Sequence, residues 1–171
     1  MRSIALPSTD YNPYYQTYID KLGDVDLLVM MQNQLGNFPE FIHSIPDEKW
    51  TYAYGLDKWT IAEVLLHVLD TERVFQYRAL RFGRNDSTPI PGFDQDQYVP
   101  ESNANGRSKE SIVEEYSSIR KSSIALFTSF DEVILKRWGT ANGFKMSVAA
   151  LGFVMLGHQK HHRDVIRERY L

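Results

Sequence analysis

The chain of 171 residues is long enough for one domain with a substantial hydrophobic core, and its 43% hydrophobic and 24% charged residues are typical of a globular protein. It contains no cysteine, which excludes disulfide bonds, thiolate metal ligands and cysteine nucleophiles. The net charge of −3 gives no electrostatic attraction to a phosphate backbone, so no nucleic-acid partner is expected.

Two features argue against a secreted or membrane protein. The N-terminal residues MRSIALPSTDYNPYY lack the apolar core of a secretory signal. No apolar run approaches the roughly 18 residues that a membrane-spanning helix needs. We therefore expect a cytoplasmic location and no membrane partner.

The first helical pattern covers residues 24–45, where apolar side chains recur at helical spacing. Gly36 and Pro39 fall inside this pattern and predict a kink or a break. The aromatic-rich residues 15–22 that precede it are expected to form a short helix or an arm.

The second helical pattern, residues 60–83, begins with a clear start signal. Thr60 and Glu63 have the spacing of a capping box, in which each side chain accepts a hydrogen bond from a backbone N–H of the other residue. Trp59 precedes the cap and is placed to pack back onto Val64.

A long connection follows, with the sequence RNDSTPIPGFDQDQYVPESNANGRS. Loops of this length are uncommon inside a domain and are typical of functional segments or of crossovers in helical bundles. Asp94 and Tyr98 are candidates to line the mouth of a site, although loop polarity and packing explain both residues more simply.

Residues 108–130 and 147–169 carry the third and fourth helical patterns. Between them, RWGTANGFKMS predicts a turn, and no segment strongly predicts a β-strand. We therefore expect an all-α fold with a single domain over residues 1–171. It should be a four-helix bundle with a long crossover loop between helices 2 and 3, and residues 1–23 should pack on it as an arm.

Two of the five histidines face the expected core from the last helix. His158 and His162 continue a seam of apolar positions, so their imidazoles lie one turn apart on one face. A shared metal ion would give both rings the polar partner that burial demands. The alternative is a hydrogen bond from each ring to a carbonyl or carboxylate. His161 lies one step to the side and is the weaker ligand candidate.

His67, near the middle of the second helix, is the expected third ligand. Its alternative role is a hydrogen bond to Glu63, one turn earlier. Glu63 would instead orient a ligating His67 if the capping box leaves it free, and Asp70 is the other candidate for that role or for a fourth ligand. His43 is expected on the surface. Three imidazoles and one vacant position describe an open, catalytic type of site for zinc or nickel.

The stretch KWTIAEVLLHVLDTERVFQYRALRF resembles the second helix of the DinB/YfiT-like superfamily, and SVAALGFVMLGHQKHHRDVIRERYL resembles its last helix. TPIPGFDQDQYV resembles the connection between its helices, so the resemblance covers essentially the whole chain. It implies a four-helix bundle with a divalent metal, commonly zinc or nickel, held by three histidines whose places are taken here by His67, His158 and His162. Homodimers are common in this superfamily, so a homodimer is expected.

The resemblance implies an enzyme that acts on small molecules, and metal-dependent hydrolysis is the first function we consider. In that function the metal activates a water molecule. A general base is not obvious, and Asp70, Glu63 and His161 are only weak candidates for it.

Two other functions stay open. In a thiol S-transferase, the metal holds the sulfur of a low-molecular-weight thiol cofactor as a thiolate. Arg73, Arg78 and Arg81 are then candidates to bind the cofactor's carboxylates, although solvated helix positions explain them more plainly. The third function is that of a metal-binding stress protein without catalysis, whose site would be plugged by side chains or by a partner subunit.

Overall fold

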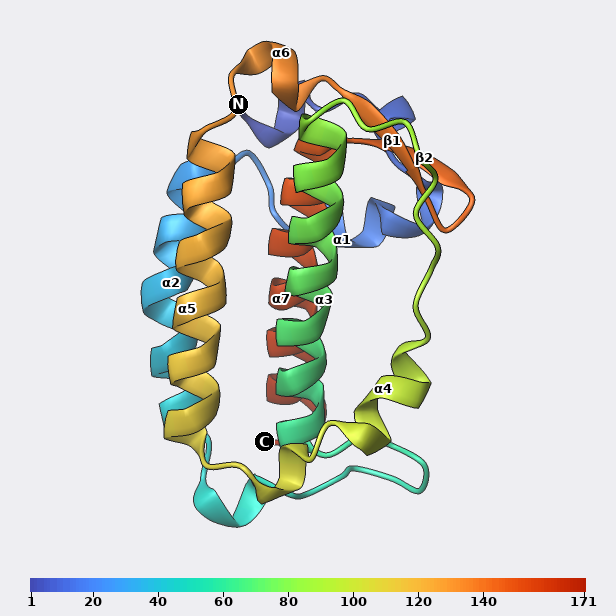
Figure 1. Ribbon diagram of the computed structural model, residues 1–171. Coiled ribbons are helices and arrows are strands. Elements are labelled where there is room, and N and C mark those ends of the chain that lie inside the picture. The colour runs from blue at the N-terminus through green and yellow to red at the C-terminus, as the bar shows by residue number, and fades with distance from the viewer.

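The computed structural model describes residues 1–171 and is dominated by four long helices (Figure 1). The four helices are α2 (Leu27–Ser44), α3 (Ile61–Gly83), α5 (Lys109–Thr128) and α7 (Val148–Arg169). The smaller elements are the helices α1 (Gln16–Asp20), α4 (Gln95–Glu101) and α6 (Glu132–Leu135), and the strands β1 (Trp138–Ala141) and β2 (Phe144–Ser147). Single 3₁₀ turns occupy Ser3–Ala5, Ser8–Asp10, Pro13–Tyr15, Asp47–Lys49 and Ala104–Gly106.

The four long helices form a bundle in which α3 packs on α5 and α7, and α2 packs on the same two helices. Helices α2 and α7 run in one direction, and α3 and α5 run in the opposite direction (Figure 1). Because α3 and α5 are parallel neighbours, residues 84–108 must return along the whole length of the bundle. The predicted four-helix bundle with a long crossover is thus confirmed, and α4 is a short helix inside that crossover.

Side-chain caps fix where the long helices begin. The predicted capping box of α3 is present: Glu63 N donates to Thr60 Oγ1 at 3.2 Å, and Thr60 N donates to the Glu63 carboxylate at 2.7 Å. Ser108 and Ser147 accept hydrogen bonds from backbone N–H groups in the first turns of α5 and α7. These local signals explain why the predicted starts of the helices match the structure closely.

Of the kink or break expected in α2, the break does not occur. The helix continues from Leu27 to Ser44 with Pro39 inside it. A proline in this position removes one backbone hydrogen bond. The fully buried Phe38 and the nearly buried Phe41 flank it on the core side, so tertiary packing holds the helix together despite that loss.

The predicted turn between the third and fourth long helices is the tip of a short β-hairpin, whose strands the sequence did not indicate strongly. Strands β1 and β2 are antiparallel, and Asn142 and Gly143 between them both have positive φ, as a two-residue hairpin turn requires. A Cβ on Gly139 would lie 1.9 Å from the Phe82 ring, so β1 sits directly against α3. Strands of four residues carry too little periodicity to be recognised, and this hairpin depends on its contact with α3.

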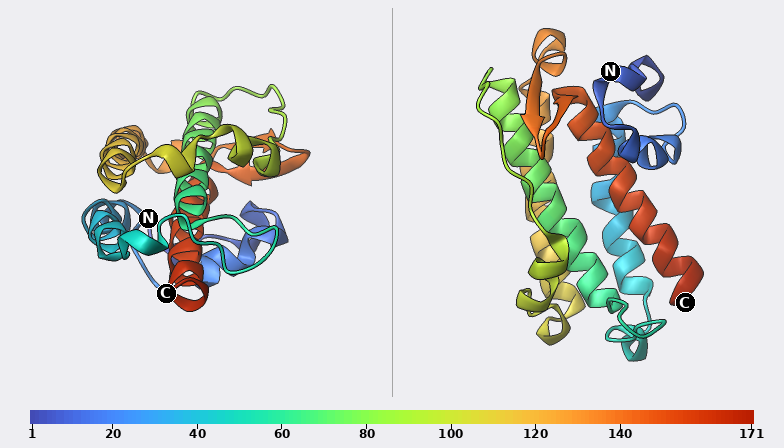
Figure 2. Two further views of the ribbon diagram at one scale, coloured as in Figure 1. Left: turned by 90° about the horizontal axis from the view of Figure 1, so that it is seen from below. Right: turned by 90° about the vertical axis from the view of Figure 1, so that its right-hand side faces the viewer.

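The N-terminal arm and the crossover flank the bundle on the same side as the hairpin (Figure 2). Helix α1 packs on α7 closely enough that a Cβ on Gly157 would lie 2.2 Å from the Tyr18 carbonyl oxygen. The crossover joins the hairpin through Ile90, whose N–H donates to the Thr140 carbonyl at 2.9 Å. None of the helices has the length and apolar character needed to cross a membrane.

The core divides into two apolar clusters. The one nearer the hairpin includes Met31, Phe82 and Phe153, and the other includes Phe38, Leu65 and Ile112. Between them, buried polar side chains extend inward from all four long helices. The three histidines lie in this middle zone.

Candidate metal centre

Three imidazoles from two helices converge inside the bundle. His67 on α3 and His158 on α7 approach each other with their Nε2 atoms 3.0 Å apart, and the Nε2 atoms of His158 and His162 are also 3.0 Å apart. The potential ligand atoms of the three residues all lie within 4.8 Å of one another, and no carboxylate belongs to the group. The structure therefore brings together the three residues that the sequence analysis selected as ligands.

Burial keeps all three rings neutral near pH 7. It lowers the pKa of His67 to about 4. Burial also lowers the pKa of His158 and of His162 well below the usual value, and the neighbouring imidazoles add to the effect. A neutral imidazole is the form that binds a metal, because its lone pair is free.

The donor set fits a metal ion better than it fits internal hydrogen bonds. The Nε2 atom of a neutral imidazole carries either one proton or one lone pair. His158 Nε2 is 3.0 Å from two other ring nitrogens, so one proton or one lone pair cannot satisfy both contacts. Two nitrogens bound to one tetrahedral zinc, each at about 2.0–2.1 Å, lie about 3.3 Å apart. The observed spacing is close to this value, so one cation could contact all three lone pairs.

His67 is held by packing more than by a strong hydrogen bond. Its ring lies 4.9 Å from the Trp59 ring, centroid to centroid, and the Thr71 hydroxyl is 3.5 Å from its Nδ1. Trp59 was expected to act as a staple at the start of α3, and the structure also places it against this candidate ligand. Thr71, one turn after His67, was not singled out from the sequence.

Neither carboxylate proposed as a partner of His67 is available to it. The two oxygens of Glu63 accept hydrogen bonds from Thr60 N at 2.7 Å and from Asn105 Nδ2 at 2.9 Å. Asp70 is half-buried and lies 3.5 Å from Arg73 in an ion pair. The capping box therefore does not leave Glu63 free to orient the imidazole.

His161 lies beside the centre and not in it. Its ring centroid is 5.0 Å from that of His162 and 5.3 Å from that of Tyr18. It is half-buried, and burial lowers its pKa. His43, on α2, is exposed as expected.

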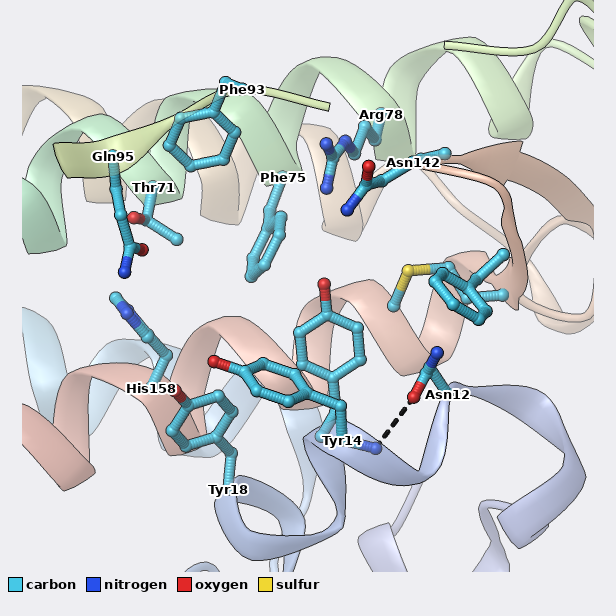
Figure 3. Close-up of a pocket in the computed structure, with 14 residues that line it drawn as sticks. Asn12, Tyr14, Tyr18, Thr71, Phe75, Arg78, Phe93, Gln95, Asn142 and His158 are labelled. Carbon is cyan, nitrogen blue, oxygen red and sulfur yellow. Dashed lines mark hydrogen bonds between the residues drawn. The ribbon is translucent and has the colours of Figure 1, made fainter. Parts of the chain in front are cut away.

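Two cavities border the centre. A cavity of about 460 Å³ reaches His158 and is walled by α3, α7, the N-terminal arm, the crossover and the hairpin (Figure 3). A second cavity of about 360 Å³ reaches His161 and His162. Asp94 and Tyr98 line neither cavity: Asp94 caps α4, and Tyr98 is exposed beside Phe93. Their neighbours Gln95 and Asp96 line the first and the second cavity respectively.

A buried polar network beside the centre was missed by the sequence analysis. Arg120 on α5 bonds to Glu72 on α3, to Gln34 on α2 and to Gln159 on α7, at 2.7–2.8 Å. Tyr116 donates a further hydrogen bond to Gln159 at 2.9 Å. The partners are 39 or more positions from Arg120 in the chain, and no local pattern links them.

The three arginines considered on α3 have different surroundings. Arg73 pairs with Glu115 at 2.6 Å, and Arg81 pairs with Asp86. Arg78 is 3% exposed, and its Nε has no hydrogen-bond partner. The solvated position that we considered for all three is therefore wrong for Arg78.

Residues 30–166, which include all three histidines, match the DinB superfamily. No curated protein matches the chain. Among solved structures, YfiT from Bacillus subtilis, described as a probable metal-dependent hydrolase with an unusual four-helix bundle topology, superimposes with a TM-score of 0.75. The superposition covers 83% of this chain and 82% of YfiT at 14% sequence identity, so the likeness shows a shared fold. This chain belongs to the DinB superfamily.

Proposed function

We propose that the protein is a metal-dependent hydrolase of small molecules, with one divalent ion held by His67, His158 and His162. The observation that carries the proposal is the convergence of three neutral imidazoles, one of which, His158, lines a cavity of small-molecule size. The description of YfiT as a probable metal-dependent hydrolase supports the same reaction class.

The donor set favours zinc or nickel. Three imidazoles without a carboxylate suit these borderline ions better than magnesium or calcium, which prefer oxygen ligands. When bound with an open coordination position, such an ion supplies a Lewis acid that lowers the pKa of water to near 7 and polarises a carbonyl oxygen.

The protein contributes binding and orientation around that position. His158 forms part of the cavity wall, so a substrate in the cavity can approach the centre directly. Gln95 from α4 and Thr71 from α3 lie at the same end of the cavity (Figure 3). We assign to the Gln95 amide and the Thr71 hydroxyl the role of holding the polar part of the substrate beside His158.

The cavity also supports an enzyme over a metal-binding protein without catalysis. A purely structural site would be closed by side chains. Here His158 borders a space of about 460 Å³, which is the size of a small-molecule pocket.

A panel of small esters and amides tests the proposal. The untagged protein is freed of metal with a chelator and reloaded with zinc or nickel, and hydrolysis is followed before and after. Activity should disappear with the metal and return with it, and His158→Ala should stay inactive, while His43→Ala should match the wild type. Conjugation of a thiol to an electrophile without any ester or amide hydrolysis would contradict the proposal and favour the thiol S-transferase.

A further inference from the structure

The larger cavity carries one unneutralised positive charge at the end away from the candidate metal centre. Its 14 lining residues include no aspartate, no glutamate and no lysine, and Arg78 is the only one that is charged when His158 is neutral. Arg78 and Asn142 lie at one end of the cavity, and His158 and Thr71 lie at the other (Figure 3).

Arg78 is buried without the partners that a buried guanidinium normally has. Its side chain is 3% exposed and its Nε makes no hydrogen bond. The phenol of Tyr15 is the one group that supports its charge, through electrostatics and hydrogen bonding, and no carboxylate faces it. Aromatic rings cover it instead: its guanidinium carbon is 5.6 Å from the centroid of Phe75 and 6.0 Å from that of Phe93 on the crossover. These contacts stabilise a cation only weakly compared with a bidentate carboxylate.

Arg120 shows what this protein does with a buried arginine that has a structural role. Arg120 is completely buried and bonds to Glu72, Gln34 and Gln159. Burying an arginine without such partners is costly, so the fold tolerates Arg78 at the expense of stability. The absence of a carboxylate partner inside the protein indicates that the countercharge is supplied by a ligand.

We propose that Arg78 binds the carboxylate of the substrate, and that the substrate is an extended monoanion whose hydrolysable ester or amide bond lies beside His158. This inference rests on the proposed function for the position of the bond, but the carboxylate site stands on its own observations. Monoesters and monoamides of extended dicarboxylic acids are one chemical class with this layout, because they carry the hydrolysable bond at one end of an apolar body and a single carboxylate at the other.

The shape and charge of the cavity favour this class. Thr71 and Arg78 are seven residues apart on α3, which is about 10 Å along the helix axis, so the ligand must be extended. Phe75 and Phe93 between the two ends suit an apolar or aromatic body. A single guanidinium neutralises a carboxylate, whereas the second charge of a phosphate dianion would be left buried without a partner.

Binding of a non-hydrolysable probe tests the carboxylate site. The probes are 4-phenylbutyrate, its neutral amide 4-phenylbutyramide and 2-phenylethyl phosphate, titrated calorimetrically into the metal-containing protein at pH 7.5. The acid should bind the wild type at least about tenfold more tightly than the amide, because only the acid offers charge-assisted hydrogen bonds to Arg78. The phosphate should bind more weakly than the acid.

Variants locate the effect. Arg78→Gln should bind acid and amide equally, and Arg78→Lys should keep part of the preference for the acid. Arg73→Gln is the matched control, because Arg73 lies on the same helix but is already paired with Glu115, and it should behave as the wild type. Thermal melts of each variant confirm that it is folded.

Two results would overturn the inference. One is an equal affinity of the wild type for the acid and the amide. This result is read on the wild-type protein and so does not depend on the folding of any variant. The other is a full preference for the acid in Arg78→Gln, as expected if the probe's carboxylate binds the metal instead. Neither result requires the protein to hydrolyse anything. If the protein preferred the acid but hydrolysed no ester or amide, the proposed function would be contradicted and the carboxylate site would stand.

Discussion

Arg120 and Glu72 are joined by two hydrogen bonds in the middle of the bundle, from Nε to Oε1 at 2.7 Å and from Nη2 to Oε2 at 2.8 Å. Gln34 and Gln159 extend the network, so it includes residues from all four long helices. Gln159 directly follows His158 in α7, and Glu72 lies on α3 after His67. The network therefore holds the two helices that carry the candidate ligands in a fixed relation.

Removing one partner of this pair should destabilise the fold strongly. We expect Arg120→Met to lower the free energy of unfolding by about 3–5 kcal/mol, because it leaves the Glu72 carboxylate buried without its countercharge. Urea unfolding followed by circular dichroism measures the change. The double variant Arg120→Met/Glu72→Met should recover most of the loss, and a single variant as stable as the wild type would contradict this account of the network.

Arg78 should respond in the opposite way to the same substitution. Arg78→Met removes a buried guanidinium that has no carboxylate partner, so we expect the free energy of unfolding to rise by roughly 1 kcal/mol. The urea experiment used for Arg120 provides the comparison. A loss of stability similar to that of Arg120→Met would mean that Arg78 has a structural partner after all.

The metal-free protein should lose stability in mild acid because its imidazoles are buried. The pKa of His67 is about 4 in the fold and about 6.5 in an unfolded chain, so the unfolded state binds more protons between these values and stability falls as the pH falls. From pH 7 to pH 5, His67 alone should contribute a loss of roughly 2 kcal/mol. Urea denaturation at pH 7 and at pH 5, in the presence of a chelator, measures this loss of stability. His67→Gln is the control. An equal loss in that variant would rule out His67 as the cause.

Two glycines with different surroundings test the contact between the hairpin and α3. Gly139→Ala should lower the free energy of unfolding by about 1–3 kcal/mol, because its Cβ would lie 1.9 Å from the ring of the fully buried Phe82. Gly36→Ala, at an exposed position inside α2 with nothing within 4 Å, should instead raise it by about 0.5–1 kcal/mol. Thermal or urea unfolding of both variants checks the difference, and equal effects would contradict the close contact.

Local signals in the sequence predicted the parts of the fold that depend on local physics. The Thr60–Glu63 capping box fixed the start of α3, and the four-residue spacing of His158 and His162 placed two imidazoles on one face of α7. His67 was assigned from its position in the second helix and from the family resemblance. The geometry of the three rings agrees with that selection.

The features that the sequence did not reveal depend on contacts between distant segments. The β-hairpin has four-residue strands and is held by its contact with Phe82. Arg78 looked like a solvated helix residue because nothing on α3 shows that Phe93, 15 positions later, covers it. Glu72 and Arg120 are separated by 48 positions, so their pairing could be seen only in three dimensions.

The metal content of purified, untagged variants tests the central claim, that His67, His158 and His162 hold one divalent ion. Elemental analysis of the wild type should find about one zinc or nickel ion per chain, and His67→Ala, His158→Ala and His162→Ala should each lose most of it. His161→Ala should retain the ion, because its ring lies beside the converging nitrogens and not among them. The account would be contradicted if the wild type bound no divalent metal after reloading. It would also be contradicted if a variant lacking all three rings kept its metal.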